Sequence, residues 1–349
     1  MCNIAGYAGS KPAAPILLEM LRQQEGLDSG FYTGIATIHQ GKIHYAKVVG
    51  TVDDLIKRTN AASLPGTIGI AHSRTPGGGV GDQWSHPFVW EKEGVIRSAL
   101  VLNGWVGCFK PQEPEYLQLA ARLIENGYEM KSAVPSGEDR WYIGNNTKVH
   151  LSDVFTQLTA SYLDAGSDAV LALQKSFARM PEETAVLMLS LTQPDAIAYG
   201  RMNFPMFQGL APHGSYLATA PQAFPKDAAP PVLLPTASSG LVYPDHFTCQ
   251  QFPDLPFHIA PITPRVKAEA YEAVVQALRS DRQTITTLRP LIKPLFEEAD
   301  CQQINTLSYE ILWDLHHQGK LIMEKEWIPG VFEGLQAPVI YLRLDPQAN

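Results

Sequence analysis

The chain opens with Met1-Cys2-Asn3-Ile4-Ala5-Gly6-Tyr7, which places a cysteine directly behind the initiating methionine. Because the residue at position 2 is small, we expect the methionine to be removed, so that Cys2 becomes the amino terminus. An α-amino group titrates near pH 8, so part of it is unprotonated at neutral pH and can accept the proton of the thiol. One residue then supplies both a nucleophile and a base. A packing role at the start of a strand is the alternative for Cys2.

The residues that follow predict a layered α+β domain. Small and apolar residues up to Ala8 predict a short buried strand, and apolar residues at helical spacing within 15–23 predict a helix behind it. Strands packed between helices in this order are typical of a layered domain. Further strands are expected at 33–39, 42–49, 67–72, 99–103, 184–191 and 196–199, and further helices at 52–59, 114–127 and 151–165.

Length, charge and hydropathy limit the classes of function. The 349 residues exceed one ordinary core and predict two domains. A net charge of -8 lacks the basic surface that a nucleic-acid or membrane-surface binder needs, so small molecules or proteins are the expected partners. We find neither a charged leader before an apolar stretch nor a run of about 18 apolar residues, and we expect a cytoplasmic protein without a membrane span.

The cysteine pattern indicates neither a disulfide framework nor a metal site. Cys2, Cys108, Cys249 and Cys301 are widely scattered, without a Cys-x-x-Cys pair or a histidine cluster at metal-ligand spacing. We therefore expect reduced thiols, no structural metal and no cofactor.

The composition changes in the last third of the chain. Prolines crowd residues 226–263, where periodicity is weak, and predict an extended linker. The linker would join a first domain at 2–225 to a second domain at 264–349.

Three amphipathic helices and two strands are expected in the second domain, an order that resembles a winged helix. The third of these helices, at 305–318, carries Glu310 and Asp314 but no lysine or arginine. Phosphate contacts need cations, so protein docking or dimerisation is favoured over DNA binding. The helices are expected at 269–279, 284–292 and 305–318, and the strands at 320–327 and 338–344.

Three further motifs of the first domain carry groups suited to chemistry. Arg74 ends a buried strand, where an unpaired guanidinium is costly and therefore indicates a bound anion. Asn103-Gly104 ends the next strand, where an amide and an unobstructed glycine N–H can both donate to one oxyanion. Asp153 stands at a helix start, where it can cap the helix or receive an ammonium group. A surface ion pair, a turn and a plain helix cap are the respective alternatives.

In this order, the motifs resemble the glutamine-hydrolysing domain of class II glutamine amidotransferases, which are amino-terminal-nucleophile hydrolases. The likeness is closest to the glutaminase half of glutamine:fructose-6-phosphate amidotransferase and covers residues 2–225. It rests on Cys2-Asn3-Ile4-Ala5-Gly6, on His72-Ser73-Arg74-Thr75-Pro76-Gly77-Gly78-Gly79 and on Leu102-Asn103-Gly104. The resemblance implies a four-layer αββα sandwich, in which two antiparallel sheets lie between helices.

The resemblance also implies the reaction. Cys2 would attack the side-chain amide of L-glutamine, its own amino group would relay the proton, and ammonia would leave a glutamyl thioester. The amide of Asn103 and the N–H of Gly104 would stabilise the tetrahedral oxyanion, where a single donor can be worth about 3 kcal/mol.

Substrate binding follows from the same likeness. Arg74 would hold the α-carboxylate of glutamine and Asp153 its α-ammonium group. Thr75, Gly77 and Gly78 would line the loop that closes over the substrate. In this chain the loop lacks the aromatic residue of the family and contains a proline without an N–H, so we expect a more mobile lid and weaker glutamine binding.

The chain contains no recognisable nitrogen-acceptor domain after residue 264, so we expect a separate ammonia-acceptor enzyme or free ammonia. The alternative function is a catalytically weak, glutamine-sensing protein with a docking or DNA-binding tail. A degenerate binding module with an unreactive thiol is a further alternative. Amino-terminal-cysteine acylases share the nucleophile, but Arg74 and Asn103-Gly104 fit the amidotransferases better. The sequence leaves a homo-oligomer open.

Overall fold

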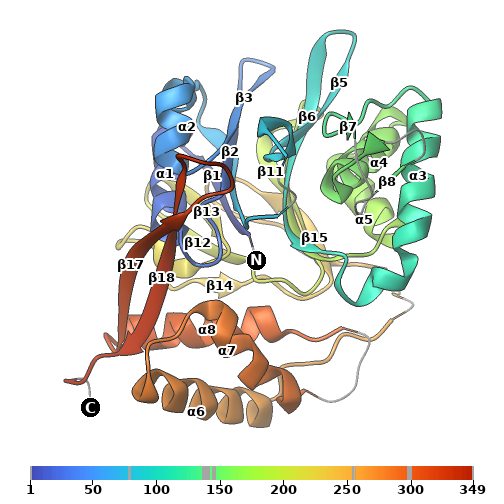
Figure 1. Ribbon diagram of the computed structural model, residues 1–349. Coiled ribbons are helices and arrows are strands. Elements are labelled where there is room, and N and C mark those ends of the chain that lie inside the picture. The colour runs from blue at the N-terminus through green and yellow to red at the C-terminus, as the bar shows by residue number, and fades with distance from the viewer. Residues whose placement is uncertain are drawn as a thin grey trace.

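The computed structural model describes residues 2–77, 80–135, 142–143, 147–253, 255, 257–296 and 301–347. It consists of a larger unit built on two antiparallel sheets and a smaller, mainly helical unit at one end of it (Figure 1). Met1, whose removal we expect, and Gly78 of the expected substrate loop lie outside the described residues.

The first sheet has seven strands, with β1 (Asn3–Gly9) at its centre. This strand is buried on both faces, because Ile4 and Ala8 face one hydrophobic core while Ala5 and Tyr7 face another. The apolar run at the start of the chain therefore belongs to a strand without a solvent face. The order across the sheet is β14 (Val232–Leu233), β12 (Phe207–Ala211), β13 (Gly214–Ala218), β1, β4 (Ile68–Arg74), β2 (Tyr32–His39) and β3 (Lys42–Val49).

The second sheet has six strands and faces the first. The core between the sheets includes Ile4 and Ile70 from the first sheet and Val101 and Leu187 from the second. The order across this sheet is β16 (Gln250–Gln251), β15 (Ser238–Val242), β11 (Gln193–Arg201), β10 (Glu183–Ser190), β6 (Val95–Trp105) and β5 (Phe88–Lys92).

Helices cover the outer faces of both sheets (Figure 1). On the first sheet these are α1 (Ala13–Gln24) and α2 (Val52–Arg58), whose apolar residues pack on the outward side chains of β1. On the second sheet they are α4 (Leu151–Asp164) and α5 (Ala169–Arg179), with α3 (Glu113–Glu125) packed on α4. The short strands β7 (Val134–Pro135), β8 (Tyr142–Ile143) and β9 (Thr147–Lys148) form a small sheet before α4.

The local predictions for the larger unit agree with these elements. The expected strands at 33–39, 42–49, 67–72 and 99–103 correspond to β2, β3, β4 and β6. The expected helices at 52–59, 114–127 and 151–165 coincide with α2, α3 and α4 to within two residues at each end.

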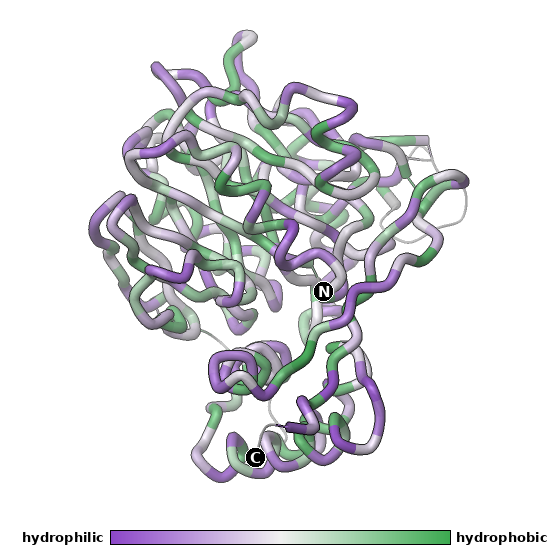
Figure 2. Tube along the Cα trace, turned by 90° about the vertical axis from the view of Figure 1, so that its left-hand side faces the viewer, coloured by the Kyte–Doolittle hydropathy of each residue, from purple (hydrophilic) through white to green (hydrophobic). Residues whose placement is uncertain are grey.

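The smaller unit contains three helices and a hairpin, in the expected order. They are α6 (Pro264–Ser280), α7 (Ile285–Ile292), α8 (Ile304–His317), β17 (Leu321–Pro329) and β18 (Gln336–Leu344). Their apolar core also takes in Leu27, Phe207 and Ala220 of the larger unit, so the two units share buried surface. Figures 1 and 2 both place the helices at one end of the larger unit, with the hairpin reaching back along it.

Two expectations need correction. Residues 226–263, expected to be a linker, contribute β14, β15 and β16 to the two sheets. The expectation of reduced thiols fails for two of the four cysteines, because Cys108 and Cys301 form a disulfide between the units, while Cys2 and Cys249 are free. Within the described part of the chain, no helix has both the length and the apolar character required to cross a membrane.

Candidate active site

Three of the predicted site residues meet at one edge of the space between the sheets. In β4, Ile68 and Ile70 face the second sheet, so the alternation of a strand directs Arg74 to the same side. In β6, Ala99 and Val101 face the first sheet, and Asn103 follows them. In β1, Ile4 faces the second sheet, and the same alternation carried back to Cys2 points its thiol inward.

The strand register brings Cys2 and Arg74 together. Asn3 pairs with Ser73 and Ile4 with His72, so the antiparallel ladder extended by one residue sets Cys2 opposite Arg74. Both side chains are buried, with 7% of Cys2 and 5% of Arg74 exposed. Burial lowers the pKa of Arg74, while the charges of Cys2 and Tyr32 act in the opposite direction. This electrostatic coupling agrees with the proximity that the register indicates.

Aromatic rings surround the Arg74 guanidinium. Its Cζ lies 4.8 Å from the centroid of the Tyr32 ring, and Tyr32 is the partner of Arg74 in the β2–β4 ladder. On another side, the same atom lies 5.8 Å from the Trp84 ring. Nη1 is buried and has no hydrogen-bond partner among the described residues. A buried cation with an unused donor is suited to an incoming anion.

The loop after β4 lies directly beside the guanidinium. Thr75 is half-buried, and its carbonyl oxygen accepts a hydrogen bond from the N–H of Gly77 at 2.9 Å. A Cβ placed on Gly77 would lie 3.3 Å from Nη2 of Arg74. A side chain at position 77 would therefore narrow the space next to the cation.

Asn103 is joined to the strand of the nucleophile through Thr219. Its Nδ2 donates to Oγ1 of Thr219 at 2.9 Å, and the same oxygen accepts the N–H of Ile4 at 3.0 Å. Asn103 is fully buried, and its Oδ1 has no partner in the described part of the chain. Thr219 thus holds the end of β6 against the start of β1, although these segments belong to different sheets.

Gly104 has a structural requirement of its own. A Cβ at this position would lie 2.2 Å from the carbonyl oxygen of Glu183 and 2.5 Å from Cα of Thr184. Both atoms belong to the backbone of β10, so no side chain can be accommodated without moving a strand. The pairing of β6 with β10 therefore demands glycine beside Asn103, independently of any role in catalysis.

Three buried histidines, His72, His86 and His150, contact one another, and His72 joins the two sheets. Nε2 of His72 lies 3.0 Å from the carbonyl oxygen of Leu102, which can only accept, so this nitrogen carries the proton. Nδ1 of His72 must then accept from Nδ1 of His86 at 3.1 Å. Burial lowers the pKa of His72 to about 3 and, with the neighbouring cations, lowers the pKa values of His86 and His150 well below the ordinary value. All three rings are neutral at pH 7.

Asp153 lies apart from this group. It is the third residue of α4, whose N-cap is His150, and it is fully buried. Its Oδ2 accepts from the N–H and Oγ of Ser132 at 2.7 and 2.8 Å, and its Oδ1 from Nε2 of Gln157 at 3.1 Å. Ser132 in turn accepts from the Trp84 indole at 2.8 Å. Asp153 is therefore linked through Ser132 to Trp84, whose ring lies beside Arg74.

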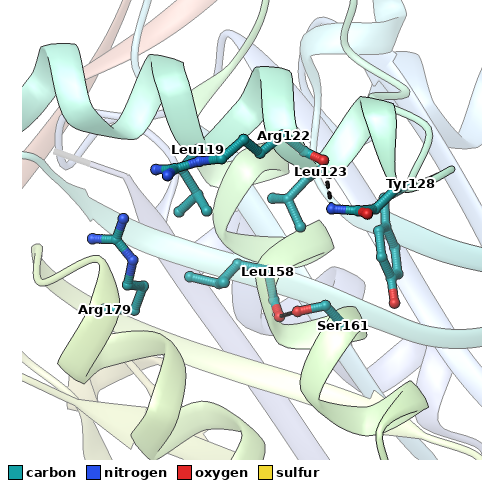
Figure 3. Close-up of a pocket in the computed structure, with 8 residues that line it drawn as sticks. Leu119, Arg122, Leu123, Tyr128, Leu158, Ser161 and Arg179 are labelled. Carbon is teal, nitrogen blue, oxygen red and sulfur yellow. Dashed lines mark hydrogen bonds between the residues drawn. The ribbon is translucent and has the colours of Figure 1, made fainter.

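A cavity of about 500 Å³ lies away from these residues, between α3, α4 and the end of α5 (Figure 3). Its walls are Leu119, Arg122, Leu123, Asn126, Tyr128, Leu158, Ser161 and Arg179. None of the predicted site residues lines it, and the arginines that border it are exposed.

Sequence reasoning missed several residues that shape the site. Thr219, Tyr32 and Trp84 carry no local signal, because each contacts the site from a segment distant in the sequence. A buried arginine at a strand end does call for neighbouring aromatic or anionic groups, but not for particular ones. The His86-Pro87 pair follows the glycine-rich loop, and only the fold places this histidine against His72.

Comparison with curated proteins identifies relatives of this chain. It is 29% identical over 253 residues, covering 71% of the chain, to the glutamine–fructose-6-phosphate aminotransferase of Pyrococcus horikoshii. It is 32% identical over 224 residues, covering 63% of the chain, to the enzyme of the same name from Caldanaerobacter subterraneus subsp. tengcongensis. The chain is a relative of glutamine amidotransferases. The resemblance inferred from the sequence is thereby confirmed.

The chain spans only about a third of the length of these relatives, 37% and 31% respectively. No protein-family model matches it. Among solved structures, the glutamine phosphoribosylpyrophosphate amidotransferase of B. subtilis aligns with a TM-score of 0.57 and 13% identity, covering 79% of this chain and 58% of that one. An allosteric regulatory enzyme of purine biosynthesis aligns with a TM-score of 0.58 and 14% identity, covering 81% and 59%. These likenesses show the mixed α/β fold of the glutamine amidotransferases.

Proposed function

We propose that this chain hydrolyses the side-chain amide of L-glutamine through a thioester on Cys2. The observation that carries the proposal is the convergence of Cys2, Arg74 and Asn103 at one edge between two sheets. The β1–β4 register sets Cys2 opposite Arg74, and Thr219 joins the amide of Asn103 to the backbone of Ile4. The homology to glutamine amidotransferases supports glutamine as the substrate.

The binding step uses the buried cation. Arg74 receives the α-carboxylate of glutamine on its unused Nη1, and Tyr32 and Trp84 keep the guanidinium plane in place. Gly77 leaves room beside Nη2 for the substrate. A planar guanidinium fork fixes the orientation of the carboxylate as well as its position.

The chemical step begins with the Cys2 sulfur, which attacks the amide carbon while the thiol proton passes to the α-amino group. The resulting tetrahedral oxyanion needs donors. A half-turn of the Asn103 amide lets the Thr219 hydroxyl donate to Oδ1 and frees Nδ2 for the oxyanion, together with the N–H of Gly104. The C–N bond then breaks, the amino group returns the proton to the departing ammonia, and water hydrolyses the thioester to glutamate and a free thiol.

Asp153 receives a different role from the one implied by the resemblance. Three hydrogen bonds already occupy its buried carboxylate, and they tie the start of α4 to Ser132. We therefore assign Asp153 to anchoring this loop, which supports Trp84 through the carbonyl oxygen of Ser132.

The architecture is assigned in the same way. We propose that the larger unit is the four-layer αββα sandwich of the amino-terminal-nucleophile hydrolases. The smaller unit has the helix order and hairpin of a winged helix, and we propose a packing rather than a DNA-binding role, because its hairpin lies against the larger unit. A separate, cytoplasmic acceptor enzyme would use the ammonia.

The test is covalent labelling with a glutamine-analogue electrophile, 6-diazo-5-oxo-norleucine, followed by intact mass and peptide mapping. One adduct on a Met-free chain, located at Cys2, is expected, together with release of glutamate and ammonia from glutamine. The Cys2→Ala variant should lose both, whereas Cys249→Ala, which removes the other free thiol, should retain both. A parent protein that binds glutamine but forms no adduct would instead be a glutamine-sensing module.

A further inference from the structure

The residue that follows the nucleophile is held by both units of the molecule. Asn3 is fully buried, and its Nδ2 lies 2.9 Å from the carbonyl oxygen of Gln24, 3.1 Å from that of Leu27 and 2.7 Å from Oγ of Ser29. Since the carbonyl oxygens only accept, the amide nitrogen must face this segment of the larger unit. Its Oδ1 therefore faces the other way, toward the smaller unit.

The donor to Oδ1 comes from the far end of the sequence. The hydroxyl of Tyr309, on α8, lies 3.0 Å from Oδ1 of Asn3 and 3.3 Å from the carbonyl oxygen of Leu27. Tyr309 is fully buried, and burial raises its pKa, so the hydroxyl keeps its proton. Asn3 thus has a full set of partners only when the smaller unit is docked.

Other contacts from the smaller unit reach the same segment of the larger one. Arg289 on α7 forms a salt bridge of 3.0 Å with Asp28, and both side chains are mostly buried. In β18, the N–H of Ile340 donates to the carbonyl oxygen of Gly26 at 2.9 Å. The segment 26–30 is therefore held by a helix and a strand of the smaller unit, while Asn3 bonds to it from within.

We propose that Tyr309 is a positioning residue for Cys2, so that the smaller unit is a working part of the glutamine site. This rests on the proposed function. Asn3 is joined to Cys2 by a peptide bond, and its side chain connects that bond to α8. Without the Tyr309 hydroxyl, a buried amide oxygen lacks its donor, and the start of β1 must shift to find another. Displacements of about 1 Å at a reacting atom can slow catalysis about a hundredfold.

The experiment compares two substitutions of identical chemistry in the full chain. Tyr309→Phe removes the hydroxyl next to Asn3. Tyr116→Phe is the matched control, because Tyr116 is 1% exposed and its hydroxyl donates to the carbonyl oxygen of Pro181 at 2.6 Å, in the core around α3 and α4. Each substitution removes one tyrosine hydroxyl that has two acceptors, which for Tyr116 are the carbonyl oxygen of Pro181 and Oε1 of Gln112.

For each protein, kcat and KM for glutamine are measured, together with the rates at which 6-diazo-5-oxo-norleucine and iodoacetamide alkylate Cys2. We expect Tyr309→Phe to lower kcat and both Cys2 alkylation rates about tenfold or more, with KM changed less than twofold. Tyr116→Phe should leave all of these values within twofold of the parent. Equal values for the two variants would overturn the inference.

Two further variants make the outcome decisive. In an Asn3→Ala background, adding Tyr309→Phe should change kcat by less than twofold, whereas a second tenfold loss would show that Tyr309 does not act through Asn3. Should Tyr309→Phe fail to fold, Arg289→Gln loosens the same segment at Asp28, and an unchanged rate of Cys2 alkylation would then overturn the inference. Iodoacetamide needs no glutamine site, so its rate reports positioning even where the glutamine reaction itself is absent.

Discussion

Replacing Arg74 by methionine should raise stability while it removes activity. The side chain of Arg74 is 5% exposed and its Nη1 has no partner among the described residues. Apolar replacements of buried ion pairs are often neutral or stabilising by about 1–4 kcal/mol, because burying a charge costs desolvation free energy, and the same cost applies to the guanidinium of Arg74. The lost contact with the Tyr32 ring, at 4.8 Å, offsets about 1 kcal/mol of this gain. We therefore expect the free energy of unfolding to stay level or to rise by at most about 3 kcal/mol.

The same substitution removes the group that we propose receives the substrate carboxylate. Two charge-assisted hydrogen bonds, each worth about 1.5–3 kcal/mol, are lost, which corresponds to a hundredfold or greater fall in kcat/KM for glutamine. Urea unfolding monitored by tryptophan fluorescence gives the stability, and glutamate release at varied glutamine concentration gives the kinetic parameters.

Arg201→Met is the matched control for stability. Arg201 is also fully buried, but it donates to the carbonyl oxygens of Phe204 and Leu234 and to the hydroxyl of Thr306. Its removal leaves several buried acceptors without donors, so we expect a loss of about 3 kcal/mol or more. If Arg74→Met destabilises the protein as much as Arg201→Met does, or leaves KM unchanged, the assignment of Arg74 as a cation awaiting a ligand is refuted.

Three more outcomes are expected. Asn103→Ala should lower kcat about a hundredfold with little change in KM, and steady-state rates equal to those of the parent would remove Asn103 from the oxyanion site. Gly104→Ala should lower the unfolding free energy by about 1–3 kcal/mol, because its Cβ would lie 2.2 Å from a backbone oxygen of β10; an unchanged urea midpoint would contradict this. In the folded protein the pKa of His72 is about 3, against an ordinary value of 6.5. Between these two values the unfolded chain binds more protons than the folded one, so the contribution of His72 to the free energy of unfolding is lost as the pH falls from 6.5 to about 3. The His72 contribution to the slope, about 1.4 kcal/mol per pH unit, should be missing from His72→Gln. His86 and His150, with lowered pKa values, and Glu25 and Glu182, with pKa values raised to about 7 and about 8, keep their own contributions in both proteins; identical slopes would count against a neutral buried His72.

The strands that carry the candidate site could be predicted because their signals are local. Cys2, Arg74 and Asn103 each stand at the end of a run of apolar residues, and such runs mark buried strands at any place in a chain. The order of the motifs then supplied the resemblance, and the comparisons confirm it. What the pattern could not supply is the pairing of the strands, which sets Cys2 opposite Arg74 and Asn103 against Thr219.

Prediction was less successful where one local sequence pattern is compatible with more than one structure. An acidic residue in the first turn of a helix can cap, anchor a loop or bind an ammonium group, and only the fold shows that Asp153 is already occupied by Ser132 and Gln157. Residues 226–263 are rich in proline, which is typical of linkers, yet short strands at a sheet edge also tolerate proline nearby. β14 and β16 are such edge strands, each only two residues long.

Asn3 shows how a distant partner can be inferred from one residue. A polar side chain in an otherwise apolar, doubly buried strand must find both donors and acceptors inside the protein. The segment that ends α1 binds its Nδ2 through the carbonyl oxygens of Gln24 and Leu27, which leaves its Oδ1 turned toward the rest of the chain. The donor to Oδ1 is a tyrosine 306 residues away, in a unit joined to the larger one by a disulfide as well. The burial of Asn3 therefore depends on the smaller unit, and so does the backbone that carries Cys2.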